Sequence, residues 1–83
     1  MSDSYGDLVE EITTARFTPV RIREGYDMGS VDDLLDQVVA ALGRGERVGP
    51  ILDGARLAHV RLREGYDIAE VDEFIARLRA QAG

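Results

Sequence analysis

The sequence predicts a small, mostly α-helical fold built from two tandem helix–extended loop–helix repeats. Residues 15–40 align with residues 55–80 without a gap, and Arg-Glu-Gly-Tyr-Asp is unbroken in both copies. The last part of each copy places apolar residues three and four positions apart, the spacing of a helix that buries one face. A chain of 83 residues suits one domain. We therefore expect the repeats to pack as an internal pseudo-twofold dimer, or as a swapped homodimer, with parallel main helices and short β-like loop segments.

Each repeat is expected to open with a short helix. In the first copy we expect it over residues 7–16. In the second copy it should start at Pro50, because a proline in the first helical turn leaves no N–H unpaired. The predicted divisions are a disordered N-terminus at residues 1–6, a first repeat at 7–42, a linker at 43–49 and a second repeat at 50–82, with both repeats in one compact domain.

An extended segment follows each short helix. Apolar residues and arginines alternate in it, which is the spacing of a β-strand. We expect the apolar side chains to face the core or the crossing of the two loops, rather than to stand exposed as a tip that enters lipid. Gly25 and Gly65 are expected to supply a turn whose backbone angles other residues resist. The two alternating runs are Val20-Arg21-Ile22-Arg23 and Val60-Arg61-Leu62-Arg63.

The main helices are expected to begin after Asp27 and Asp67. A carboxylate at this position accepts hydrogen bonds from the unpaired N–H groups of the first turn. Glu70, three residues after Asp67, predicts a reciprocal capping box in the second copy. Gly43 is expected to end the first main helix.

Apolar residues in the main helices form a narrow seam of the coiled-coil type, which Leu34 and Phe74 widen toward a globular core. Each seam spans only about two heptads, too few to hold a coiled coil alone. We therefore expect the two seams to pack on each other. The seam residues are Met28, Val31, Leu35, Val38 and Leu42 in the first copy, and Ile68, Val71, Ile75, Leu78 and Ala82 in the second.

Charge and composition narrow the classes of function. The net charge of −6, from 16 acidic and 10 basic residues, disfavours nucleic-acid binding, which depends on neutralising phosphates. All the basic residues are arginine, a usage that suggests a GC-rich bacterial genome. The absence of cysteine fits a reducing compartment, and no apolar stretch reaches the roughly 20 residues of a membrane-spanning helix. We expect a cytoplasmic protein, with association at the membrane of a pole or septum as a further option.

No group of residues has the pattern of a catalytic or metal site. His59 is the only histidine, and we expect it to face solvent from a loop. The neighbouring acids Asp32-Asp33 and Asp72-Glu73 point in different directions on a helix, so they do not form an acid–base pair. We therefore expect no enzyme, no metal, no cofactor and no small-molecule substrate.

The repeated motifs resemble the N-terminal module of the DivIVA family of bacterial division and polar-growth proteins. The first copy carries the resemblance in Phe17, Arg23-Glu-Gly-Tyr-Asp27 and Val31-Asp-Asp-Leu-Leu35, and the second in Gly65-Tyr-Asp and Glu70-Val-Asp-Glu-Phe-Ile75. The resemblance covers nearly all of the chain after residue 7. It implies a parallel homodimer in which short helices lead to crossing loops and long helices begin a coiled coil. It also implies loop-tip apolar and arginine residues on inward-curving membrane, and partner proteins recruited along the scaffold.

The chain departs from that family at several points. The long C-terminal coiled coil is missing, so polymeric scaffolding is not expected. The loop before Gly25 is longer, and Arg23-Glu24 replaces the phenylalanine–arginine pair that precedes the glycine in the family. Leu57 also stands in the second copy where the first has Phe17. We expect a non-enzymatic protein-interaction or assembly module related to bacterial cell division or polar growth; the alternative is a peripheral membrane-binding module.

The candidate binding residues lie mainly in the loops. Their arginines are expected either to hold lipid phosphate or an acidic partner, or to pair with Glu24, Glu64 or the aspartates that begin the main helices. The expected partner is another protein, with self-association and a membrane surface as further options. The candidate partner- or membrane-binding residues are Phe17, Val20, Arg21, Ile22, Arg23, Val60, Arg61, Leu62 and Arg63. The motif residues, whose two tyrosine rings are expected to pack and to make one hydroxyl bond each, are Gly25, Tyr26, Asp27, Val31, Gly65, Tyr66, Asp67 and Val71.

Overall fold

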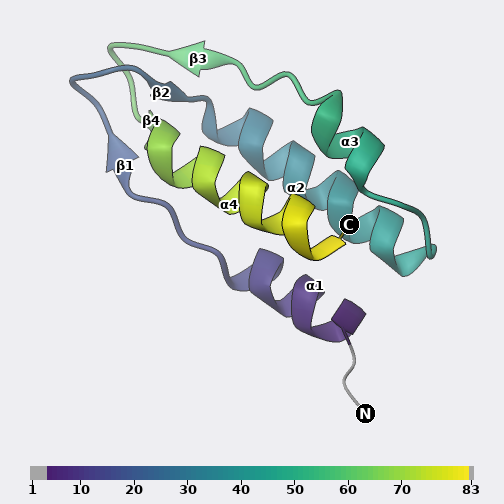
Figure 1. Cartoon of the computed structure of the whole chain (residues 1–83). Helices are drawn as coiled ribbons and strands as arrows, with labels where there is room; N and C mark the ends of the chain where they lie inside the picture. The colour runs from purple at the N-terminus through teal and green to yellow at the C-terminus, as the bar shows by residue number, and fades with distance from the viewer. Residues whose placement is uncertain (1–3, 83) are drawn as a thin grey trace.

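The chain forms a bundle of helices with a small sheet at one end (Figure 1). A computed structural model describes residues 4–82. The first helix begins at Ser4, so residues 4–6 of the expected disordered N-terminus are helical, and residues 1–3 lie outside the described part of the chain. The elements are α1 (Ser4–Thr14), β1 (Pro19–Val20), β2 (Gly25–Tyr26), α2 (Met28–Gly43), α3 (Gly49–Asp53), β3 (His59–Val60), β4 (Gly65–Tyr66) and α4 (Ile68–Ala82).

The fold class differs from the one that we predicted. Residues 4–82 form four helices and a four-stranded antiparallel sheet, so the fold is a small α/β fold and not a mostly α arrangement of parallel-helix repeats. The prediction was wrong because it treated the extended segments as loops. Alternating apolar and charged residues indicate an extended backbone, but they do not reveal which other backbone will accept and donate its hydrogen bonds.

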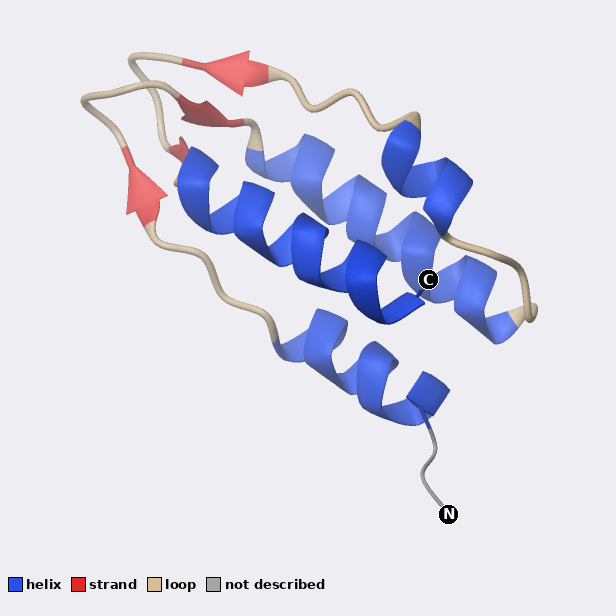
Figure 2. Cartoon of the chain, in the orientation of Figure 1, coloured by secondary structure: helices blue, strands red, loops and turns tan. Residues whose placement is uncertain are grey.

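The sheet joins one copy of the repeat to the other. Its order is β1-β4-β2-β3, and all three neighbouring pairs are antiparallel. β1 of the first copy pairs with β4 of the second, and β3 of the second pairs with β2 of the first. At the centre, Tyr26 lies opposite Tyr66, its equivalent forty residues later. Figure 2 shows the strands gathered at the end where α2 and α4 begin.

One cluster of apolar side chains fills the space between the helices. α1 packs on α2, while α3 packs on both α2 and α4. Figure 1 shows α1 and α3 on opposite sides of the pair formed by α2 and α4. Six of its buried residues belong to the predicted seams, and Leu34 and Phe74, which widen the seams, add two more. The seam residues Met28, Ile68 and Ile75 are only half-buried, and the side chain of Ala82 lies outside the described residues. The buried members are Leu8, Ile12, Val31, Leu34, Leu35, Val38, Ala41, Leu42, Val48, Leu52, Val71, Phe74 and Leu78.

The short helices attach to this core through equivalent anchors. Leu8 and Ile12 stand one turn apart on α1, so both point to the same side. Val48 and Leu52 occupy the equivalent positions in the second copy, with Val48 just before α3. Because α1 has 11 residues and α3 has five, the two sides of the bundle are not equally covered.

The caps of the main helices form largely as predicted. Asp27 Oδ2 accepts the N–H of Ser30 at 2.9 Å, and Asp67 Oδ1 accepts the N–H of Glu70 at 3.0 Å. The prediction of a reciprocal bond from the Glu70 side chain to the start of its own helix is wrong. The Glu70 carboxylate instead accepts the N–H and the hydroxyl of Thr18, at 2.7 and 2.8 Å. α2 ends at Gly43, as predicted.

Glycine is required in β2 and β4 for a reason other than the predicted one. The described glycine with a positive φ is Gly45, at +73°, so Gly25 and Gly65 do not adopt the backbone angles expected of them. A Cβ on Gly25 would lie 2.8 Å from the carbonyl oxygen of Tyr66, and one on Gly65 would lie 2.7 Å from that of Tyr26. The two central strands therefore approach more closely than a side chain at either position allows.

Candidate docking surface at the loop tips

The candidate site is formed by two loops that extend beyond the sheet. Residues 21–24 connect β1 to β2, and residues 61–64 connect β3 to β4; we call these segments the tip loops. Figure 1 shows both at the same end of the molecule, away from the C-terminus. The sheet pairing holds them side by side because each loop joins strands that pair with strands of the other copy.

The apolar residues of these segments divide into two classes. Val20 and Val60 are buried, with exposed fractions of 9% and 7%, as we predicted. Ile22 and Leu62 are 98% and 91% exposed, so the prediction that they face the core or the loop crossing is wrong. The strand period accounts for part of this, because residues two apart share a face only while the strand continues. β1 and β3 end at Val20 and Val60, and the chain then bends outwards.

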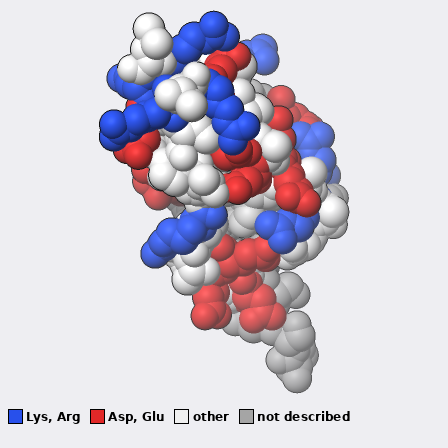
Figure 3. Space-filling model, turned by 90° about the vertical axis from the view of Figure 1, so that its left-hand side faces the viewer, with Lys and Arg blue, Asp and Glu red and all other residues white. Residues whose placement is uncertain are grey.

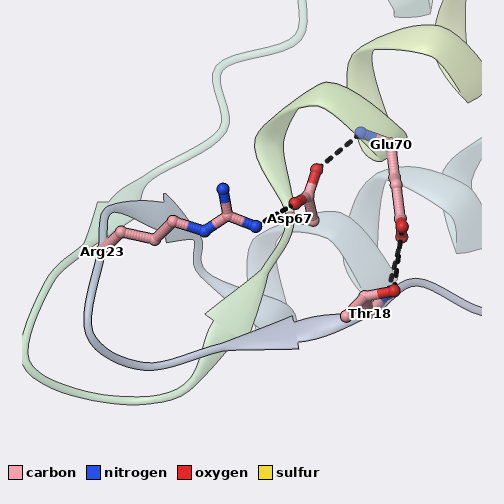
Figure 4. Close-up of polar contacts among 4 residues, drawn as sticks. All are labelled: Thr18, Arg23, Asp67 and Glu70. Carbon is pink, nitrogen blue, oxygen red and sulfur yellow. Dashed lines mark hydrogen bonds and ion pairs between the residues drawn. The ribbon is translucent and has the colours of Figure 1, made fainter.

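Three of the four arginines in the tip loops have a carboxylate partner. Arg23 Nη2 lies 2.6 Å from Asp67 Oδ2, as Figure 4 shows, and Arg63 Nη2 lies 3.3 Å from Asp27 Oδ1. Arg61 lies 3.8 Å from Glu24, at the limit of an ion pair. These contacts confirm the pairing with glutamate or helix-start aspartates that the sequence suggested. Arg21 has no such partner among residues 4–82.

The charge of the surface is unevenly distributed. Figure 3 looks at the end that carries the tip loops and shows arginine side chains gathered around uncharged ones at the top, with acidic side chains below. Asp7 and Glu10 are exposed on α1, a helix that lies away from the tip loops. The net charge of −6 therefore does not describe the tip loops, where residues 21–24 and 61–64 carry four arginines and two glutamates.

Leu62 has a backbone conformation that is unfavourable for its side chain. Its φ is +69°, and it is the one non-glycine residue with a positive φ among residues 4–82. A left-handed conformation costs a residue with a Cβ roughly 1–2 kcal/mol. The backbone of this exposed leucine is therefore strained. The sequence did not predict the strain, since leucine is not a residue that favours such angles.

The tyrosines at the start of the main helices hold the two copies together below the tips. The Tyr26 hydroxyl donates to Asp72 at 2.6 Å and the Tyr66 hydroxyl donates to Asp32 at 3.2 Å, as predicted for one bond each. The hydrogen bond to Asp72, together with burial, raises the pKa of Tyr26 to about 12. Burial, and then the charge and hydrogen bond of Asp32, raise the pKa of Tyr66. Both phenols therefore stay neutral donors at ordinary pH.

Phe17 and His59 lie away from the apex of the tip loops. Phe17, which we had grouped with the loop residues, packs its ring 5.2 Å from that of Tyr66 and 5.5 Å from that of Phe74. His59 is exposed as expected, but it lies in β3 rather than in a loop. Its Nδ1 lies 2.8 Å from Glu24 Oε2, a contact between the copies that the sequence did not indicate.

No three His, Asp or Glu side chains among residues 4–82 are placed to hold a metal ion. That part of the chain also has no helix with the length and apolar content that a bilayer crossing requires. Comparisons of the chain with protein-family models, with curated proteins and with solved structures found no match. The resemblance to the DivIVA module therefore rests on the repeated motifs and stays a prediction.

Proposed function

We propose that this chain is a non-enzymatic docking module that attaches to an anionic membrane surface through its tip loops. The observation that carries the proposal is the exposure of Ile22 and Leu62, at 98% and 91%, at the same position of both copies. Each stands between two arginines in the chain. The assignment to bacterial cell division or polar growth rests on the family resemblance of the motifs.

The shape of the tip loops suits a lipid surface. Burying a leucine or isoleucine side chain yields about 1.5–3 kcal/mol, and an arginine near anionic lipid adds about 1 kcal/mol. Two narrow apolar tips bury far less than the roughly 800 Å² per partner of a stable protein interface. A fluid bilayer adapts to two separate tips, whereas a protein partner needs a preformed pocket for each.

The negative charge of the chain is compatible with this orientation. The molecule measures 45 × 22 × 18 Å along its principal axes, and Figure 1 shows the tip loops at one end of its length. Electrostatic interactions are screened over about 8 Å at physiological ionic strength. Carboxylates at the far end, such as Asp7, therefore repel an anionic surface weakly when the tips face it.

Flotation with vesicles tests the proposal. Vesicles containing phosphatidylserine or phosphatidylglycerol should carry the chain at low salt, and vesicles of phosphatidylcholine alone should carry much less. The double substitution Ile22→Ser with Leu62→Ser should weaken binding at least about tenfold, because it removes roughly 3 kcal/mol or more of apolar transfer free energy. Val39→Ser, at a half-buried valine on α2, is the matched control and should float like the parent chain.

Two results would contradict membrane docking: no binding to anionic vesicles at low salt, or equal flotation of the parent chain and the tip variant.

A second candidate is a protein partner with an acidic pocket. The pairing of Arg23 with Asp67 and of Arg63 with Asp27 favours it, because a held guanidinium presents a defined geometry. A labelled acidic peptide would then bind the parent chain, and the double substitution Arg23→Ala with Arg63→Ala would lose that binding.

A further inference from the structure

A groove runs between α1 and α2 on the side of the bundle, separate from the tip loops. Ile12 of α1 and Leu35 and Val39 of α2 form its apolar floor, and Asp32 and Asp36 line it from α2. Ile12 and Leu35 are buried and Val39 is half-buried, so Val39 contributes most of the accessible apolar surface of this floor. The groove continues to Phe17 at the sheet end.

The two aspartates of the groove have no cationic partner in the described part of the chain. They stand one helical turn apart and both are exposed. Asp32 accepts the Tyr66 hydroxyl, and none of the ion pairs among residues 4–82 includes Asp32 or Asp36. Arg16, the cation that lines the groove, donates to the carbonyl oxygen of Ala15 at 2.9 Å. Two like charges one turn apart cost α2 a few tenths of a kcal/mol.

The second copy has an ion pair at one end of the equivalent surface. Position 79 is arginine where the first copy has Val39, and position 53 is aspartate where it has Thr13. Arg79 Nη2 lies 2.6 Å from Asp53 Oδ1, which joins α4 to α3. The equivalent of Asp36 is an alanine. The second copy keeps a hollow beside Leu52 and Ile75, the equivalents of Ile12 and Leu35, but the residues equivalent to Asp36 and Val39 do not line it. The two copies therefore differ in apolar surface and in charge at that end of the groove.

We propose that the groove between α1 and α2 binds a cationic amphipathic helix of a partner protein. Two helices with an apolar floor between them accept a third helix, whose apolar side chains at intervals of three and four residues meet Leu35 and Val39. Lysines or arginines one turn apart on that helix meet Asp32 and Asp36. The lining residues of α2 run from Asp32 to Val39, so the contact extends over roughly 11 Å, or about two turns of the partner helix. The tip loops remain free for a membrane, and the inference does not depend on that proposal.

A synthetic amphipathic peptide of leucine and lysine tests the inference. The probe is a labelled helix of about 14 residues with one leucine face, and its binding is measured by fluorescence anisotropy at physiological salt. A peptide of the same composition without an apolar face is the control. Asp36→Arg, and the pair Thr13→Asp with Val39→Arg that copies the second repeat, should each weaken binding at least about tenfold.

Asp33→Arg is the matched control, because it makes the same charge change on α2 but lines a different hollow. It should change the affinity less than about twofold. Circular dichroism shows whether each variant keeps its helices.

The tip variant of Ile22 and Leu62 should bind the peptide like the parent chain, and Asp36→Arg should leave vesicle flotation unchanged. Failure of the groove proposal is therefore distinguishable from failure of the membrane proposal. Equal binding of both peptides, or equal loss with Asp33→Arg and Asp36→Arg, would overturn the groove assignment in favour of general charge attraction. Concentration-dependent self-association that Asp36→Arg abolishes, without peptide binding, would overturn it in favour of a second copy of the chain.

Discussion

Arg23 and Asp67 connect the tip of the first copy to the start of the second main helix. One oxygen of Asp67 lies 2.6 Å from Arg23 Nη2, while the other accepts the N–H of Glu70 at 3.0 Å (Figure 4). Arg63 and Asp27 form the equivalent pair. One aspartate therefore caps a helix and holds the tip loop of the other copy, which couples the position of the candidate docking surface to the order of the helix beneath it.

Replacing Asp67 should destabilise the fold more than replacing Arg23. Asp67→Ala removes a helix cap, worth about 1 kcal/mol, in addition to the ion pair. Arg23→Ala removes only the ion pair, whose arginine side chain is 66% exposed, and should cost less than about 1 kcal/mol. Urea denaturation measures both free energies of unfolding. A larger loss for Arg23→Ala than for Asp67→Ala would contradict the dual role of the aspartate.

Alanine at Gly25 or Gly65 should disrupt the centre of the sheet. The new Cβ would stand 2.8 Å from Tyr66 O in the first case and 2.7 Å from Tyr26 O in the second. Backbone of the other copy must then move, so each substitution should lower the free energy of unfolding by about 1–3 kcal/mol. Gly43→Ala is the control. Its Cβ meets no atom within 4 Å, and it should raise stability by up to about 1 kcal/mol.

Glycine at position 62 should stabilise the fold and weaken docking at the same time. Leu62→Gly removes the cost of a side chain at φ +69° and should raise the free energy of unfolding by about 1 kcal/mol. It also removes an exposed apolar tip, so vesicle flotation should weaken. Ile22→Gly removes the other tip without relieving a positive φ, and it should not increase stability. If neither substitution changes flotation, the tips are not the docking surface.

Tyr26 should make stability depend on alkaline pH. Its pKa in the folded chain is about 12, above the ordinary value of 10.0, because Asp72 and burial favour the neutral phenol. The folded state thus retains the proton better than the unfolded state, and stability falls as pH rises. The contribution is complete below pH 10.0 and disappears between 10.0 and about 12. Tyr26→Phe should reduce this dependence to the part that Tyr66 contributes. Asp72→Asn should lower the pKa of Tyr26, as absorbance of the phenolate reports. A titration of the parent chain in which no tyrosine ionises above the ordinary range would contradict the assignment.

Several features of the candidate site were predictable because they depend on nearby residues. Asp27 and Asp67 cap their helices through N–H groups three residues later, so the contact is determined locally. The pairing of tip-loop arginines with helix-start aspartates was foreseeable in kind, since both charges lie near the turn. The sequence could not predict which copy supplies each partner, because Arg23 and Asp67 are separated by 44 positions.

The exposure of Ile22 could not be predicted from the sequence. Alternation correctly indicated an extended backbone and the burial of Val20, two positions earlier. It could not indicate that β1 ends at that valine and that the chain bends outwards afterwards. The end of a two-residue strand is decided by the neighbour with which it pairs, and a periodicity in one segment contains no information on that neighbour.

The sequence by itself determined that the chain is duplicated, that each copy has a capped main helix, and that most of the apolar seam residues of these helices are buried. These follow from local hydrogen bonding and from a helical period that any amphipathic helix must satisfy. Only the tertiary structure decided that the extended segments cross between the copies to form a sheet, that Gly25 and Gly65 are needed for close approach, and that Ile22 and Leu62 remain exposed. Strand pairing and close packing are relations between distant segments, so their outcome depends on how the whole chain is arranged.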